Sequence, residues 1–88
     1  MKKLVEVQEV EGAGLLSLLG QRVLLMCANY FYTGKLTGVN DDCVELEDPA
    51  IVYQTGEWKA AKYADEQKLG VKVFHVRIPA IEAFGVSK

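Results

Sequence analysis

Hydrophobic and polar residues alternate in short segments separated by glycine and polar turn residues, a pattern typical of an antiparallel β protein. Residues 22–28 are mostly apolar at consecutive positions, which predicts a strand covered on both faces. Residues 30–39 form the next predicted strand and carry Gly34 and Gly38, four positions apart on one face. Because glycine weakens a strand, we interpret the two glycines as sites of sharp bending or close backbone approach.

A polar turn and an alternating segment follow. Residues 40–42, with the sequence Asn-Asp-Asp, predict a hairpin turn, because these side chains tolerate turn dihedral angles. The third predicted strand, 43–47, places its two central apolar side chains on one face and its acidic side chains on the other. Asp48 and Pro49 are expected to interrupt this strand, which resumes at 51–54.

The second half of the chain is less regular. Residues 55–70 mix charges with two large aromatic side chains, and they predict either an extended hairpin or a long loop. We expect a fourth strand at 71–76, a tight connection at 77–79 and a short fifth strand at 80–84. Residues 85–88 are expected to form a frayed end.

The start of the chain predicts a short helix after an ambiguous segment. Residues 1–12 fit either a flexible tail or an extra edge strand, because charged residues interrupt the apolar ones. Four leucines then cluster within 14–19, and Gly20 stands where a C-terminal cap is expected. We therefore expect a short N-terminal helix over 14–19 that covers an apolar end of the sheet.

Size and charge limit the class of protein. A chain of 88 residues fits one domain, 1–88, and 50% of the residues are hydrophobic, enough for a small core. Ten basic and twelve acidic residues give a net charge of −2, without the basic excess typical of tight phosphate binding. The sequence has no apolar run of membrane-spanning length, and acidic residues interrupt what would have to be a signal peptide. These features predict a cytoplasmic location.

Residues with obvious chemistry are few. The cysteines, Cys27 and Cys43, fall in predicted strands, and with one histidine, His75, they are too few for a zinc site. We interpret both as free, buried thiols. Glycine-rich phosphate loops, paired catalytic carboxylates and nucleophile motifs are missing, so the sequence predicts neither an enzyme nor a cofactor.

The order of these segments resembles the Sm/LSm family. The residues that carry the resemblance are Tyr32, Gly34, Leu36, Gly38 and Val39, followed by the polar turn and the alternating strand. The resemblance covers 14–84, and it implies a mostly β fold, a small, strongly bent five-stranded antiparallel Sm-like barrel with a short N-terminal helix. It also implies a homo-oligomeric ring of five to seven subunits. Exposed strand edges give such a ring a physical reason to form.

The resemblance also implies an RNA site, which diverges from the family pattern. In Sm-like rings the turns after the second and fourth strands line the pore and hold RNA. The corresponding RNA-binding residues here are Asn40, Asp41, Asp42 and Arg77. The family's base-reading Asn falls on Cys43 or Val44, and Ile78 replaces the Gly that follows the family's Arg. Carboxylates occupy the stacking position, where they repel phosphates.

Two assignments stay open at this point. Secondary RNA-binding candidates are Trp58, Lys59, Lys62 and Tyr63, because aromatic and basic side chains interleave there as in single-strand binders. The alternative is that the aromatic residues hold this segment against the barrel or a neighbouring subunit. Likewise, Arg77 either contacts RNA or pairs with Asp41 or Asp42.

The sequence thus leads to two functions from different classes. The first is a ring-forming Sm-like protein that binds single-stranded RNA through its pore-lining turns. The second is an oligomeric scaffold or protein-interaction barrel without nucleic-acid binding. Near-neutral charge and the missing motif residues favour the second function, whereas the strand and glycine pattern favours the first.

Overall fold

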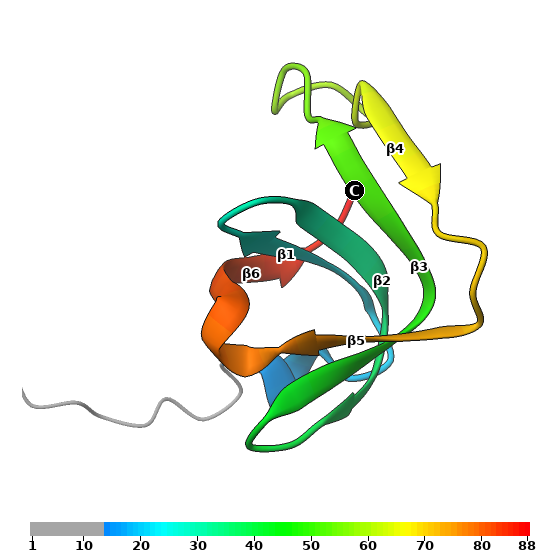
Figure 1. Ribbon diagram of the computed structural model, residues 1–88. Helices are drawn as coiled ribbons and strands as arrows, with labels where there is room; N and C mark the ends of the chain where they lie inside the picture. The colour runs from blue at the N-terminus through cyan, green and yellow to red at the C-terminus, as the bar shows by residue number, and fades with distance from the viewer. Residues whose placement is uncertain (1–13) are drawn as a thin grey trace, which may run out of the picture.

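Residues 14–88, which the computed structural model describes, form one strongly curved antiparallel sheet of six strands (Figure 1). The strands are β1 (Arg22–Cys27), β2 (Phe31–Val39), β3 (Cys43–Gln54), β4 (Asp65–Lys68), β5 (Val73–Arg77) and β6 (Ile81–Val86). The predicted mostly β, antiparallel class is confirmed, with six strands instead of five.

The long strand β3 organises the sheet. Neighbouring strands follow the order β4-β3-β2-β1-β6, and β5 also pairs with β3. The partners divide β3 between them, because β5 pairs with residues 43–47 and β4 with residues 50–54. Among residues 14–88, β6 pairs only with β1, so the sheet does not close on itself. It therefore has free edges at β6 and along β4 and β5.

Asp48 and Pro49 do not end the third strand as the sequence predicts. The pairing of β3 with β2 shifts here, from Thr33 opposite Ala50 to Lys35 opposite Glu47. Asp48 has a φ of 51°, in the left-handed region that Asp tolerates better than most residues. This β-bulge accommodates the missing N–H of proline, and β3 continues through it.

Apolar side chains cover both faces of β1, as its consecutive hydrophobic residues predict. The concave face contributes to the main core cluster, which consists of Val23, Leu25, Cys27, Leu36, Val44, Leu46 and Val76. On the opposite face Leu24 packs in a second cluster with Val52 and Tyr63. Tyr63 comes from the segment between β3 and β4, so this segment covers the outer face of β1 within a single protomer.

The predicted N-terminal helix over 14–19 is instead a single 3-10 turn, η1 (Leu15–Leu18). Gly14 and Gly20 have φ angles of 91° and 86°, which end helical geometry on both sides. A segment of four residues forms too few hydrogen bonds to offset the unfavourable nucleation of an α-helix, so the tighter 3-10 turn forms. Leu15 and Leu18 nevertheless pack against the main core cluster, which agrees with the expected covering role.

The segment 55–70 is an extended hairpin, the first of the two alternatives, because β4 pairs with the second half of β3. A polar cluster holds β4 in place. The Arg22 guanidinium donates to the Thr33 hydroxyl at 3.1 Å, and this hydroxyl donates to the Glu66 carboxylate. At the same bulge the Lys68 ammonium lies 2.8 Å from the Asp48 carboxylate. Four strands are therefore joined by side chains as well as by the backbone.

The last two strands lie slightly later than predicted. The fourth predicted strand, 71–76, corresponds to β5, and the tight connection is a second 3-10 turn, η2 (Ile78–Ala80). The expected frayed end contributes two residues, Gly85 and Val86, to β6. Residues 1–12, expected to be a tail or an extra strand, lie outside the described residues. Among residues 14–88 we find no helix with the length and apolarity needed to cross a bilayer.

Candidate functional site

The polar turn between β2 and β3 is closed by Asn40. Its backbone N–H donates to the Cys43 carbonyl at 3.0 Å. Its side-chain Oδ1 accepts hydrogen bonds from the backbone N–H groups of Asp42, at 2.8 Å, and Cys43, at 2.9 Å. The amide oxygen of Asn40 is therefore hydrogen-bonded within the turn, as is common for Asn in this position. Asp41 and Asp42 are exposed, with their carboxylates toward solvent.

Arg77 lies beside this turn, as the resemblance implies. It ends β5 directly opposite Cys43, and the next residue, Ile78, donates its N–H to the Asp42 carbonyl at 2.8 Å. Arg77 is exposed, and among residues 14–88 no carboxylate lies within ion-pair distance of it. Its suggested pairing with Asp41 or Asp42 is therefore absent. We call Asn40, Asp41, Asp42 and Arg77 the turn surface.

A cross-strand pair of side chains continues from the turn surface along β3 and β5. His75 Nε2 lies 3.4 Å from Glu45 Oε2, and the Thr37 hydroxyl donates to Glu45 Oε1 at 2.9 Å. Glu45, His75 and Cys43 border a shallow pocket of about 220 Å³. Within the described part of the chain, no three His, Cys, Asp or Glu side chains are grouped closely enough to hold a metal ion.

The secondary candidates do not join the turn surface. Trp58, Lys59, Lys62 and Tyr63 lie between β3 and β4, at the opposite end of β3 from residues 40–42 (Figure 1). Tyr63 is only 8% exposed, and its hydroxyl lies 3.2 Å from Ser87 Oγ. Trp58 is 54% exposed, and the Lys88 ammonium lies over both rings, 5.7 Å from the Trp58 centroid and 4.9 Å from that of Tyr63.

The packing of Tyr63 distinguishes the two interpretations of this segment. Tyr63 belongs to the core cluster on the outer face of β1, so its ring is not available to stack on a base. It packs the segment onto the sheet, as the alternative interpretation states. Trp58, Lys59 and Lys62 remain exposed.

A row of aromatic side chains is the main surface feature that the sequence does not predict. Tyr53 and Tyr30 meet edge to face with ring centroids 6.1 Å apart, and Tyr30 lies 6.4 Å from Tyr32. Tyr32 in turn lies 5.5 Å from Phe74. Burial raises the pKa of the Tyr32 hydroxyl, with smaller contributions from Cys27, Tyr30 and Tyr53. The alternation of Tyr30 and Tyr32 is visible in the sequence, but the position of Tyr53 depends on the register of β2 and β3.

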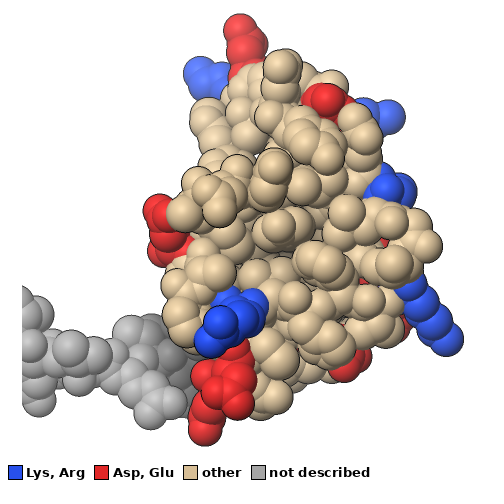
Figure 2. All heavy atoms as spheres, in the orientation of Figure 1, with Lys and Arg blue, Asp and Glu red and all other residues tan. Residues whose placement is uncertain are grey.

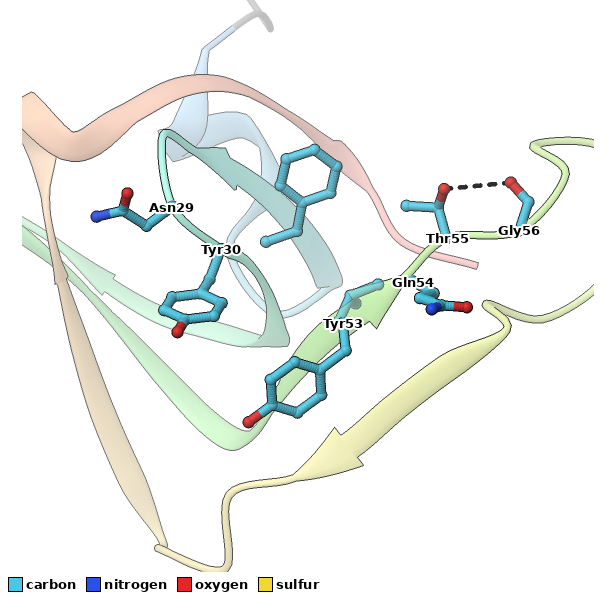
Figure 3. Close-up of a pocket in the computed structure, with 8 residues that line it drawn as sticks. Asn29, Tyr30, Tyr53, Gln54, Thr55 and Gly56 are labelled. Carbon is cyan, nitrogen blue, oxygen red and sulfur yellow. Dashed lines mark hydrogen bonds between the residues drawn. The ribbon is translucent and has the colours of Figure 1, made fainter.

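Two residues of the row, Tyr30 and Tyr53, border an open pocket of about 530 Å³ (Figure 3). The Tyr30 and Tyr53 rings project in the same direction from their strands, and Asn29, Gln54 and Thr55 add polar groups on either side of them. The Thr55 hydroxyl donates to the Gly56 carbonyl at 3.1 Å. No charged residue lines this pocket.

The two cysteines are free thiols on β1 and β3. Cys27 is buried, and burial, followed by the nearby Glu82 carboxylate, raises the pKa of its thiol. Cys43 is partly exposed beside the turn surface, whereas the sequence suggested that it is buried.

Comparison with protein-family models, with curated proteins and with solved structures found no match to this chain.

Proposed function

We propose that this chain is the protomer of an Sm-like, barrel-forming ring that binds single-stranded RNA through its turn surface. The observation that carries this proposal is the meeting of Arg77 with residues 40–42. Residues far apart in the sequence are held together there by the pairing of Cys43 with Arg77 and by the hydrogen bond from Ile78 to Asp42. A copy of the turn surface from each subunit would surround a common axis in a ring.

Two free edges of similar length support assembly. β5 and β6 have five and six residues, and each pairs with only one strand among residues 14–88. Both edge strands expose apolar side chains: Val73 is 39% exposed on β5, and Phe84 and Val86 are 44% and 60% exposed on β6. Pairing β5 of one copy with β6 of the next would satisfy backbone groups and bury these side chains.

The chemistry of the turn surface suits weak contacts with bases and phosphates. The uncommitted Arg77 guanidinium offers several donors to a phosphate or to a base edge. Asn40 keeps its Nδ2 group as a donor, because only its oxygen is used in the turn. Asp41 and Asp42 can accept hydrogen bonds from base amino groups but repel phosphates. One such site per subunit gives appreciable affinity only when a ring presents several.

A second function is favoured by the charge of the same surface. The turn surface has two exposed carboxylates and a single guanidinium. The Asn40 side-chain oxygen, which could accept a hydrogen bond from a base, already accepts two from the backbone of the turn. On the face drawn in Figure 2, acidic and basic side chains are mixed around the margin and form no continuous basic patch. An oligomeric scaffold that binds only proteins fits this charge distribution.

The experiment that separates these functions measures mass and RNA binding together. Light scattering should give five to seven times the protomer mass of 9.7 kDa. The same sample is titrated into labelled oligo-U and oligo-A at low salt, where we expect saturable, salt-sensitive binding. Binding should weaken at least about tenfold in Arg77→Ala with the ring mass unchanged. Lys72→Ala, which removes one exposed positive charge outside the turn surface, serves as the matched control.

Each outcome has one meaning. A ring that binds RNA and loses affinity only in Arg77→Ala supports the proposed function. If the ring binds neither RNA, the scaffold function replaces it. A mass of 9.7 kDa at micromolar concentration overturns the Sm-like ring itself.

A further inference from the structure

A second surface, separate from the turn surface, is defined by two adjoining pockets. The first, of about 530 Å³, is bordered by Tyr53 and Tyr30 (Figure 3). The second, of about 350 Å³, is bordered by Tyr30, Tyr32, Pro79 and Glu82. Tyr30 lines both pockets, so its ring is the ridge between them. We call the surface formed by these five residues the aromatic surface.

The aromatic surface combines ring faces with donors that have no partner in the protein. Tyr30 and Tyr53 are 47% and 53% exposed, a large fraction for aromatic side chains beside one another. Asn29 and Gln54 border the first pocket, and among residues 14–88 their side-chain amides make no hydrogen bond with protein groups. A ligand seated there meets apolar ridges and N–H or O–H donors.

The arrangement of the rings suits one kind of backbone. The Tyr30 centroid lies 6.1 Å from that of Tyr53 and 6.4 Å from that of Tyr32, and the Tyr30 ring separates the two pockets. A polyproline II helix has three residues per turn, so its residues on one side repeat about every 9.3 Å along the axis. Two residues on the same side of such a helix can therefore lie in the two pockets on either side of the Tyr30 ring, as in other aromatic-lined grooves that bind proline-rich peptides. Proline has no N–H and presents only carbonyl acceptors, which the Tyr hydroxyls and the Asn29 and Gln54 amides can satisfy.

The charges on the aromatic surface indicate the charge that a ligand should carry. The first pocket has no charged lining residue, and the second has a single one, Glu82, which is exposed beyond Pro79. A neutral peptide with one basic residue at one end complements this arrangement. We propose that the aromatic surface binds a proline-rich peptide segment in the polyproline II conformation, with an Arg or Lys of the peptide beside Glu82.

Single-stranded nucleic acid fits the same rings less well. Its bases could stack on Tyr30 and Tyr53, but its phosphates would find no cation among the residues that line the two pockets and would lie near the Glu82 carboxylate. The proposal does not rest on RNA binding by the turn surface. The two surfaces share no residue, so each can fail while the other holds.

The test uses fluorescein-labelled decaproline peptides and the full-length protein. One peptide has an arginine at its N-terminus, a second has it at its C-terminus, and two controls have a glutamate or no charged residue in its place. Both arginine positions are needed because a polyproline II helix can lie in either direction. Fluorescence anisotropy is followed up to about 1 mM protein. We expect saturable binding to at least one arginine peptide and binding about threefold weaker to the uncharged one.

Variants then locate the binding. Tyr53→Ala and Tyr30→Ala each remove an exposed ring and should weaken binding at least about tenfold. Tyr53→Phe keeps the ring and should cost much less. Glu82→Gln should abolish the preference for the arginine peptide. The matched control is Trp58→Ala, which removes an aromatic side chain that is 54% exposed and lies outside both pockets. Circular dichroism and mass are measured for each variant.

The outcomes distinguish the possible ligands. Peptide binding that is lost in Tyr53→Ala, but kept in Trp58→Ala and in Arg77→Ala, supports the proposal whatever the result with RNA. No saturation with any decaproline peptide overturns it. If instead labelled oligo-U binds and loses affinity in Tyr53→Ala, the aromatic surface belongs to nucleic acid, and the peptide assignment is wrong.

Discussion

The Thr33 hydroxyl on β2 donates a hydrogen bond to the Glu66 carboxylate on β4, although these two strands do not pair with each other. The bond passes over β3 at the bulge of Asp48 and Pro49, where the pairing of β2 with β3 is interrupted. Thr33 is fully buried, and it also accepts a hydrogen bond from Arg22. This hydroxyl therefore connects β1, β2 and β4 beside one of the places where the pairing of β2 with β3 shifts.

Replacing this hydroxyl tests its contribution to stability. Thr33→Val keeps the shape of the side chain but removes both hydrogen bonds, and we expect it to lower the free energy of unfolding by about 1–2 kcal/mol. Arg22 and Glu66 are partly exposed and can be rehydrated, which keeps the loss from being larger. The measurement is urea unfolding. Thr37→Val is the control, since this exposed hydroxyl contacts only Glu45 and should matter by less than about 0.5 kcal/mol.

The two glycines of β2 should respond differently to the same substitution. A Cβ at Gly34 would lie 2.9 Å from Leu46 Cβ and 3.3 Å from the Glu47 carbonyl oxygen, so the backbone of β3 would have to shift. Gly34→Ala should therefore destabilise the fold by about 1–3 kcal/mol. A Cβ at Gly38 would lie 3.5 Å from Glu45 Cβ, an ordinary contact.

Gly38→Ala should be neutral or stabilising by up to about 0.5 kcal/mol, because alanine loses less chain entropy on folding. Thermal and urea unfolding of the two variants, measured side by side, check the difference. Equal losses would mean that bending, rather than close approach, determines the need for glycine at both positions.

Acid should weaken the bulge. The hydrogen bond from Lys68, with the attraction of Lys68 and Arg22, lowers the pKa of the Asp48 carboxyl below its ordinary value of 3.8 despite partial desolvation. Because the folded pKa is the lower one, the carboxylate stabilises the fold above pH 3.8, and this stabilisation disappears as the pH falls through the folded pKa.

Asp48→Asn keeps a residue that tolerates the left-handed φ and removes the titration. We expect the variant to be less stable than the natural protein near neutral pH and the difference to vanish in acid. Urea unfolding from about pH 7 to about pH 2 measures this. Lys68→Gln should reproduce the trend, since it removes the main cause of the shift. A difference that stays constant with pH would contradict this account.

Charges placed on the two free edges should prevent assembly of the proposed ring. Val73→Lys on β5 and Val86→Lys on β6 each put an ammonium group on an edge strand, a change that commonly blocks strand pairing. We expect either variant to bring the mass in solution down to 9.7 kDa. Val71→Lys is the control, because Val71 is 49% exposed but lies outside the strands. Loss of the assembly in all three variants would point to charge in general rather than to the edges.

Much of the sheet could be predicted from local pattern. The alternation in residues 43–47 and the consecutive apolar residues of β1 predicted these strands correctly. A strand buried on one face alternates apolar and polar residues, and a strand buried on both faces is apolar throughout. The polar turn at 40–42 was also predicted correctly, since Asn40 closes it with its own side chain. The two glycines lie where the pairing of β2 with β3 shifts, in agreement with their interpretation as bends.

Long-range contacts explain what was missed. Pro49 predicts a break, but the left-handed conformation of Asp48 forms a bulge that lets the strand continue. Lys68, twenty residues later in the sequence, stabilises this bulge by a hydrogen bond to Asp48. The prediction of a helix over 14–19 is wrong. It relied on the cluster of leucines and did not take into account that the flanking glycines leave room for only one turn. In the turn surface, the proximity of Arg77 and Asp42 followed from the resemblance. The aromatic surface needed the register that places Tyr53 beside Tyr30.

The division of β3 between two partners has a further consequence for the behaviour of the protein in a crowded solution. Its outer side is covered by β4 and β5, which are only four and five residues long and are separated by residues 69–72. A stray extended chain therefore meets two short, offset rows of hydrogen-bonding groups instead of one long row. Such an edge is a poor template for amyloid-like growth. The interruption between β4 and β5 protects the protein against aggregation while leaving β5 able to accept one short strand.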